Sequence, residues 1–359
     1  MNDLPPMTRR TALTGAAAAA ALALTAPSAA ARPEDAKRSR LGLTMWACRF
    51  VRRQRIKAGG PDIWEPLRFL EYCREVGAGG MHIRLRDVDD ATAEVLRTRL
   101  KETGMFLDAV VTLPGPEARE TERFAAEMRT AARSGASAAR TTLFPGRRYE
   151  EFHSVEAFDS ALAEGLRRLV RGVPFAEAAG VPLALENHKD QRLDARVALF
   201  KEFDSPFVRA CLDTGNNIAL LDDPYETAEA LAPFAASVHL KDQSLAPTPD
   251  GFLLGDVPLG AGSLDLPRLV RTIREAWPEA RFSLELITRD ALRVPCLTDG
   301  YHASFPTLPA RDLARTLRLV RARPTQGQQI ASLSVAERVD RETANVHESL
   351  QYARQELNL

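Results

Sequence analysis

The sequence predicts an α/β protein, a (β/α)8 TIM barrel with a C-terminal helical extension, and three observations support this fold class. Eight apolar runs of strand length alternate with eight segments of helical spacing over about 280 residues. Glycine follows several of the helical segments directly, which is a common helix C-terminal signal. Four of the apolar runs end in a carboxylate or an imidazole, at the strand end where such barrels carry their active sites.

The expected elements follow one another in a regular order. Strands are expected at residues 41–50, 81–85, 106–113, 138–144, 181–188, 208–213, 236–241 and 281–287. Helices are expected at residues 65–76, 90–102, 117–134, 154–179, 195–203, 224–234, 264–277 and 309–323. Because Pro174 lies inside the longest helical segment, we expect that helix to be kinked or split. The segment at 255–262 is expected to be a loop, and no G-x-G-x-x-G motif follows the first strand.

Residues 1–31 have the features of a twin-arginine-type export signal. Arg9 and Arg10 precede an Ala/Leu-rich run, and Pro27 and small residues follow that run. The run is too short and too rich in alanine to span a bilayer comfortably. We therefore expect an exported protein, periplasmic or extracellular, with no stable membrane insertion after processing. The barrel is expected at 40–323 and the helical extension at 324–359, either packed on the barrel exterior or mediating a homo-oligomer.

Composition limits the classes of partner. The chain has 359 residues with 45% hydrophobic and 27% charged residues, which is typical of a soluble globular domain. Lys plus Arg and Asp plus Glu number 48 each, so that no basic excess points to nucleic acid. The four cysteines are scattered without a C-x-x-C pair, and we expect them to be buried, reduced thiols. These properties favour a small-molecule partner over nucleic acid.

Four residues at strand ends predict a metal site. They are Glu186, Asp213, His239 and Glu285, each at the end of an apolar run. Any one of them alone could be a salt-bridged strand end. A buried carboxylate or imidazole is costly unless it is paired or metal-bound, and four of them on different strands converge at one end of the barrel. Three carboxylates and one imidazole favour one divalent ion, Mn²⁺, Mg²⁺ or Co²⁺, with Zn²⁺ as a further candidate.

Further candidate residues lie beside these ligands. Alternate residues of a strand share a face, which pairs Glu186 with His188, His239 with Lys241, and His82 with Arg84. For the second residue of each of these pairs, two alternative roles remain open. Lys241 would polarise a substrate carbonyl or form an ion pair, and His188 would act as an acid/base or as a hydrogen-bonded barrel residue.

Three residues of the first two strands are candidates for substrate binding. His82 and Arg84 would contact substrate or form a structural ion pair. Trp46 would stack on a sugar ring or belong to the core.

The motifs in the second half of the chain resemble those of a known family. In order along the chain they are Glu186-Asn187-His188, Asp213-Thr214-Gly215-Asn216, Val238-His239-Leu240-Lys241-Asp242, Gly260-Ala261-Gly262 and Glu285. Together they resemble the xylose isomerase-like TIM-barrel superfamily over residues 40–323. This superfamily includes sugar phosphate isomerase/epimerase-like proteins, ketose 3-epimerases, inosose dehydratases and the endonuclease IV type.

The resemblance implies roles for particular residues. It implies the same four metal ligands, with Glu186 and Glu285 also acting as acid and base on opposite faces of the substrate. It implies a substrate contact for Asn216, where many ketose epimerases have a histidine. A metal that grips a carbonyl and a neighbouring hydroxyl stabilises an enediolate, and two flanking carboxylates can remove and return the proton.

We therefore expect a metal-dependent isomerase or epimerase of a sugar or keto-sugar. The alternative is a lyase or dehydratase that uses the same site on a keto-sugar or keto-cyclitol, and the third is a non-catalytic carbohydrate-binding barrel. Export favours an extracellular carbohydrate as substrate. The sequence shows no Arg/Lys cluster or glycine-rich loop that would indicate a phosphosugar.

Overall fold

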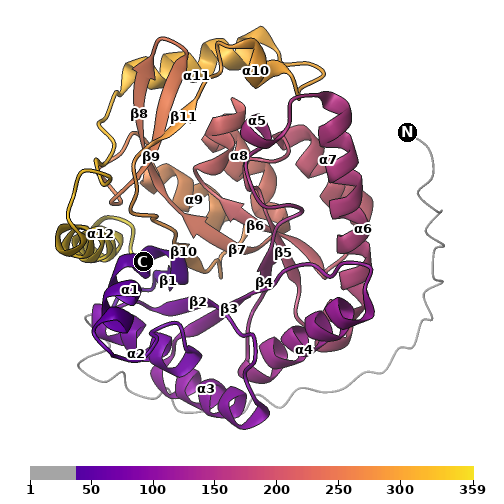
Figure 1. Ribbon diagram of the computed structural model, residues 1–359, viewed down its shortest axis with the longest axis vertical. Coiled ribbons are helices and arrows are strands. Elements are labelled where there is room, and N and C mark those ends of the chain that lie inside the picture. The colour runs from indigo at the N-terminus through magenta and orange to yellow at the C-terminus, as the bar shows by residue number, and fades with distance from the viewer. Residues whose placement is uncertain (1–37) are drawn as a thin grey trace. The chain divides into compact units, whose positions relative to one another are not determined.

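The computed structural model describes residues 38–359, so the predicted export signal at residues 1–31 lies outside the described residues. Eight parallel strands form a closed barrel in the order β1-β10-β7-β6-β5-β4-β3-β2 (Figure 1). They are β1 (Gly42–Thr44), β2 (Gly80–Arg84), β3 (Phe106–Val110), β4 (Ala139–Thr141), β5 (Leu183–Glu186), β6 (Val208–Asp213), β7 (Ala235–Leu240) and β10 (Phe282–Leu284). The predicted fold class is confirmed.

Helices connect consecutive strands around the outside of the barrel (Figure 1). The main ones are α2 (Pro66–Val76), α3 (Asp90–Thr103), α4 (Ala118–Ser134), α6 (Val155–Ala179), α7 (Leu193–Phe203), α8 (Pro224–Leu231), α9 (Leu266–Ala276) and α11 (Ala310–Ala322). Short helices are α5 (Arg148–Glu151), α10 (Asp299–His302), η3 (Asn216–Leu220) and η4 (Ala232–Phe234). Gly77 and Gly180 end α2 and α6 in the left-handed conformation, with φ of 82° and 66°.

The first strand is shorter than predicted. β1 ends at Thr44, and the 3-10 helix η2 (Met45–Cys48) and the α-helix α1 (Arg49–Lys57) follow it. Trp46 and Cys48 therefore lie in η2 rather than in a strand. The first turn of α1 is closed from a distant part of the chain, because Glu342 Oε2 accepts hydrogen bonds from Phe50 N and Val51 N at 2.7 and 2.9 Å. A contact so remote in sequence overrides the local strand pattern.

The longest helix is continuous. α6 runs through Pro174, so of the predicted kink or split the split does not occur. Proline at this position removes the hydrogen bond that the carbonyl of Val170 would otherwise accept. Val170 is 51% exposed, which places this part of the helix against solvent.

The segment after β7 forms a β-hairpin, so the loop predicted at 255–262 begins only after β9, at Pro258. β8 (Asp242–Thr248) and β9 (Gly251–Val257) pair in antiparallel fashion, and β11 (Leu292–Val294) pairs with the other side of β9. These three strands form a sheet separate from the barrel, which lies beside α10 and α11 in Figure 1. The loop that leaves β9 is held by Asp242, whose Oδ2 accepts hydrogen bonds from Gly260 N and Gly262 N, both at 2.9 Å.

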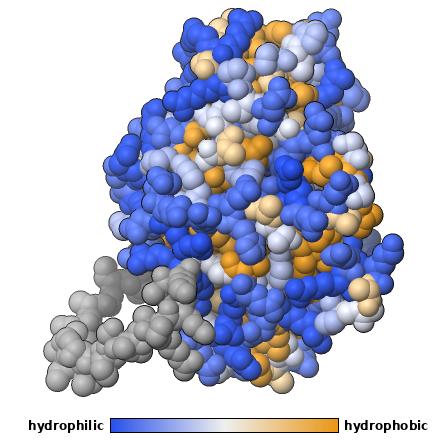
Figure 2. All heavy atoms as spheres, turned by 90° about the vertical axis from the view of Figure 1, so that its left-hand side faces the viewer, coloured by the Kyte–Doolittle hydropathy of each residue, from blue (hydrophilic) through white to orange (hydrophobic). Residues whose placement is uncertain are grey.

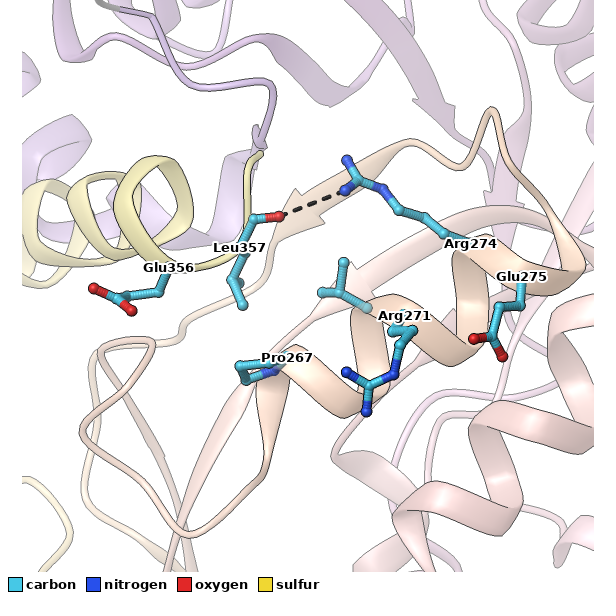
Figure 3. Close-up of a pocket in the computed structure, with 7 residues that line it drawn as sticks. Pro267, Arg271, Arg274, Glu275, Glu356 and Leu357 are labelled. Atoms are coloured by element: carbon cyan, nitrogen blue, oxygen red, sulfur yellow. Dashed lines mark hydrogen bonds between the residues drawn. The ribbon is translucent and has the colours of Figure 1, made fainter.

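The C-terminal extension is a single helix, α12 (Val335–Glu356), which begins with a capping box formed by Ser334 and Glu337. It packs against α1 and η2. Its C-terminal end is attached to α9, because Arg274 donates to the carbonyl of Leu357 at 3.5 Å (Figure 3). The extension therefore packs on the barrel exterior, as one of the two expectations had it.

The described residues form one large core with a mostly polar surface. All four cysteines are buried and free, as expected. The face shown in Figure 2 is largely hydrophilic, with apolar residues in scattered groups. Within residues 38–359, no helix combines the length and apolar character needed to cross a bilayer.

Candidate metal centre

Four strand ends bring their polar side chains to one point. Glu186 ends β5, Asp213 ends β6, His239 lies in β7, and Glu285 follows β10. One ligand atom from each of the four lies within 4.8 Å of the ligand atoms of the other three. His239 Nδ1 is 3.2 Å from Glu285 Oε2, 3.7 Å from Glu186 Oε2 and 3.8 Å from Asp213 Oδ2. The four residues predicted from the sequence therefore form one cluster.

The candidate ligand atoms at the centre of this cluster face one another and the ammonium of Lys241. Asp213 Oδ2, His239 Nδ1 and Glu285 Oε2 are buried, and within the described residues they have these charged contacts but no other hydrogen-bond partner. Asp213 Oδ1, in contrast, accepts from the backbone N–H groups of Gly215 and Asn216 at 2.9 and 2.8 Å, which fixes the carboxylate. Buried polar atoms without partners are rare in native proteins. This set fits a divalent metal ion, which all three atoms could bind.

Lys241 brings a positive charge to the same point. Its Nζ lies 2.8 Å from Glu285 Oε2 and 3.1 Å from Asp213 Oδ2. Burial raises the pKa of Asp213 to about 6, although the Lys241 ammonium opposes this shift. Of the two alternatives for Lys241, the structure shows the ion pair. Lys241 directly follows β7, and it shares a face with His239 as predicted, because both side chains reach Glu285.

Glu186 is held by two partners that occupy both of its oxygens. Arg140, in β4, donates from its guanidinium to Oε2, and Asn216 Nδ2 donates to Oε1 at 2.9 Å. Burial would raise the pKa of Glu186, but the Arg140 guanidinium outweighs it and lowers the pKa to about 2. Sequence reasoning missed Arg140. The signal was a charged residue inside an apolar strand, which requires a buried counter-charge.

Asn216 links three charged residues. Its Oδ1 accepts hydrogen bonds from Lys241 Nζ at 3.1 Å and from Lys189 Nζ. Lys189 was not predicted from the sequence; it is buried, and its backbone has a positive φ of 62°. Burial lowers the pKa of Lys189 to about 8, and the Lys241 charge acts in the same direction. The side chain of Asn216 is thus engaged with protein groups, whereas the resemblance implied a substrate contact.

His82 lies behind the cluster. It is fully buried, and its Nδ1 is 3.0 Å from Nε2 of His239. His82 therefore contacts a candidate metal ligand, which differs from the substrate contact or ion pair expected for it.

A pocket of about 300 Å³ opens onto the cluster. Among its lining residues are Trp46, Arg84, Arg140, His188 and Glu285. The guanidinium of Arg140 lies over the ring of Trp46, 4.9 Å from its centroid, so one face of this ring is already covered. The pocket contains the predicted candidates Trp46, Arg84 and His188 beside a candidate metal ligand.

A closed parallel barrel with acidic groups and an imidazole at its strand ends defines a class of barrel enzyme. The family model for xylose isomerase-like TIM barrels matches residues 70–318, and the chain belongs to this family.

Solved structures share the fold at low sequence identity. A xylose isomerase-like TIM barrel protein from Mycobacterium smegmatis in complex with magnesium is 19% identical, with a TM-score of 0.50 over 80% of this chain and 98% of that one. An L-ribulose 3-epimerase is 15% identical, with a TM-score of 0.53 over 89% of this chain and 96% of that one. These likenesses show the fold alone.

A curated relative is similar at the sequence level. The 3-oxo-isoapionate decarboxylase of Pectobacterium atrosepticum is 36% identical over 118 residues, which are 32% of this chain. The chain spans 42% of the length of that relative.

Proposed function

We propose that this protein is a metal-dependent lyase that breaks a bond next to the carbonyl of a keto-sugar through an enediolate. The observation that carries this proposal is that the carboxylates of Glu186 and Glu285 are bound by different partners. Both oxygens of Glu186 are held by Arg140 and Asn216. Glu285, in contrast, lines the pocket, and its Oε2 is paired with the ammonium of Lys241. Glu285 is therefore the glutamate that faces the pocket and is placed to move a proton of a bound substrate.

The residues that would hold the metal are Glu186, Asp213, His239 and Glu285. A divalent ion bound there would supply Lewis-acid stabilisation of the negative charge that develops on the substrate carbonyl oxygen. Lys241 adds a fixed positive charge at the same point, because its ammonium already lies between two of these carboxylates.

Proton transfer falls to Glu285, and His188 assists by hydrogen bonding. Glu285 removes the proton from the carbon beside the carbonyl, and the electron pair of the broken carbon–hydrogen bond forms the enediolate. The carbon–oxygen bond at the next carbon then breaks, and the leaving oxygen takes the proton that Glu285 has removed, while His188 donates a hydrogen bond to that oxygen. Burial lowers the pKa of His188 to about 4, so the ring is neutral at pH 7, and its Nδ1 has no partner within the described residues. A neutral imidazole in the pocket can both donate and accept a hydrogen bond.

The sequence-level relative supports bond cleavage as the reaction class. That relative is a decarboxylase by name. Loss of carbon dioxide from a 3-oxo acid leaves the same kind of enediolate, and the same stabilising groups would serve either cleavage.

An isomerase or epimerase is the second candidate, and one observation favours it. Glu186 and Glu285 come from β5 and β10, on either side of the strands that carry Asp213 and His239. Two carboxylates placed in this way could exchange a proton on both faces of a substrate. This reaction requires Glu186 to leave Arg140 or Asn216, which the lyase reaction does not.

The test is product analysis in deuterium oxide. The Mn²⁺-loaded full chain is incubated with a panel of keto-sugars and keto-cyclitols, and the products are examined by mass spectrometry. A lyase gives a product of lower mass, and an epimerase gives a product of unchanged composition with one deuterium. Glu285→Gln should abolish either reaction, while Glu348→Gln, at an exposed position of α12, should not. Tight binding of a keto-sugar without turnover would overturn both and leave a binding barrel.

A further inference from the structure

We infer that the substrate carries a carboxylate, held by Arg84 and Arg168 in the pocket beside the metal cluster. This inference rests on the proposed function, because it takes the substrate carbonyl to lie at the cluster. The sequence shows no cluster of basic residues, and the fold creates one. Arg84 ends β2, Arg140 lies in β4 and Arg168 lies in α6, and all three line the same pocket.

Two of the three arginines, Arg84 and Arg168, form no ion pair within residues 38–359. Arg140 is neutralised by Glu186. Arg168 Nη2 donates to the carbonyl of Leu113 at 2.7 Å, but its Nε is buried without a partner. Arg84 forms no hydrogen bond or ion pair with any residue in the described part of the chain. A buried guanidinium N–H without a partner, as at Nε of Arg168, is costly, whereas Arg84 is half-buried. A carboxylate is the group that the planar donors of both side chains fit best.

The charge on the pocket wall favours an anion. The carboxylate that lines it, Glu285, is paired with Lys241, and Arg140 is paired with Glu186. Arg84 and Arg168 are left on the wall without an ion pair among the described residues, although the charge of Glu127 acts on Arg84. A neutral keto-sugar leaves this charge unbalanced, whereas a keto-sugar acid balances part of it.

Further arginines line a second cavity next to this pocket. An adjoining cavity of about 360 Å³ shares Arg168 and is also lined by Arg86, Arg119 and Arg123. These outer arginines have carboxylate partners, Glu117 for Arg119 and Glu127 for the other two. Glu120 also lines this cavity, so its charges are largely balanced. The preference for an anion therefore rests on Arg84 and Arg168 of the inner pocket.

The test compares ligands that differ in one anionic group. Binding of 5-keto-D-gluconate, D-fructose and D-fructose 6-phosphate to the Mn²⁺-loaded full chain is measured by calorimetry. These probes keep the anionic group away from the ketone, so the metal alone does not explain a preference. We expect the keto acid to bind at least about tenfold more tightly than fructose, as charge-assisted hydrogen bonds imply.

Substitution of single arginines shows which residues cause the preference for the keto acid. Arg84→Gln removes no hydrogen bond or ion pair within the described chain and should fold normally. It should reduce the preference for the acid to about twofold or less, as should Arg168→Gln. Arg171→Gln is the matched control, because Arg171 lies one turn along α6 and donates to the carbonyl of Pro114 outside the pocket. This control should keep the full preference.

Each outcome decides between the two proposals. Equal affinity for the acid and for fructose would overturn the carboxylate site, even if a neutral keto-sugar is turned over. Tighter binding of the phosphate than of the acid would also overturn it. A preference for the acid that depends on Arg84, without turnover of any probe, would support the site while counting against the lyase.

Discussion

Nδ1 of His82 lies 3.0 Å from Nε2 of His239, and both rings are fully buried. A hydrogen bond in which His239 donates from Nε2 leaves Nδ1 of His239 as the acceptor, facing the three carboxylates of the cluster. Metal-binding histidines are commonly oriented by a partner on the second ring nitrogen. The pair therefore connects β2 to the candidate metal centre.

His82→Phe should weaken metal binding. Loss of the acceptor frees the ring of His239 to rotate and to change tautomer, and changes of this kind lower metal affinity about 10- to 100-fold. The affinity is measured by competition with a chromogenic chelator for Co²⁺. His82→Gln, whose amide oxygen can accept the same hydrogen bond, should retain most of the affinity. Unchanged affinity in His82→Phe would show that His82 does not orient His239.

Lys241→Met should make the protein more dependent on metal for its stability. Asp213 and Glu285 then lose the cation that lies 3.1 and 2.8 Å from them, and breaking a buried ion pair costs about 3–5 kcal/mol. A divalent ion in the cluster replaces that charge. Saturating Mn²⁺ should therefore raise the thermal midpoint more in the variant than in the wild type.

The control for this experiment is Lys201→Met, at an exposed position of α7. It should show the same metal-induced shift as the wild type. A smaller shift in Lys241→Met than in the wild type would mean that the metal does not occupy the place beside Lys241.

The barrel and the four candidate ligands could be predicted because their signals are local. Helical segments that end at Gly77 or Gly180 mark where the chain turns back. Strands that end in Glu186 or Asp213 place a carboxylate where parallel strands of a barrel converge. Neither signal depends on knowing which distant residues come into contact.

The structure differs from the prediction where distant residues come into contact and at the turn between β8 and β9. The strand pattern around Trp46 gives way to η2 and α1, whose first turn is closed by Glu342 from the C-terminal helix. The hairpin of β8 and β9 had a local signal, because the turn residues Pro249 and Asp250 stand between the two strands and Gly251 follows them as the first residue of β9. The three arginines of the pocket lie in separate elements, and only the fold brings Arg84 and Arg168 together.

Stability should fall as pH rises through the titration of Glu342. Burial raises the pKa of this carboxyl from an ordinary value near 4.5 to about 7, although the backbone N–H groups of Val51 and Phe50 oppose the shift. The folded protein therefore holds this proton more tightly than the unfolded chain. The contribution to stability is present below pH 4.5 and is lost as pH rises to 7.

Glu342→Gln should remove this part of the pH dependence, which is measured as the thermal midpoint between pH 4.5 and pH 8. Glu348→Gln, at an exposed position of the same helix, should leave the profile of the wild type unchanged. A profile of Glu342→Gln that coincides with that of the wild type would contradict the role of Glu342 titration.

The most direct test of the central claim, a divalent metal bound by four strand-end residues, is the metal content of the purified full chain. Elemental analysis is made after loading with Mn²⁺ and gel filtration, beside the double variant Glu186→Gln/Glu285→Gln and the control Glu348→Gln. We predict about one Mn²⁺ per chain in the wild type and the control, and a large loss in the double variant. No bound metal in the loaded wild type, or equal metal in the double variant, would contradict the account.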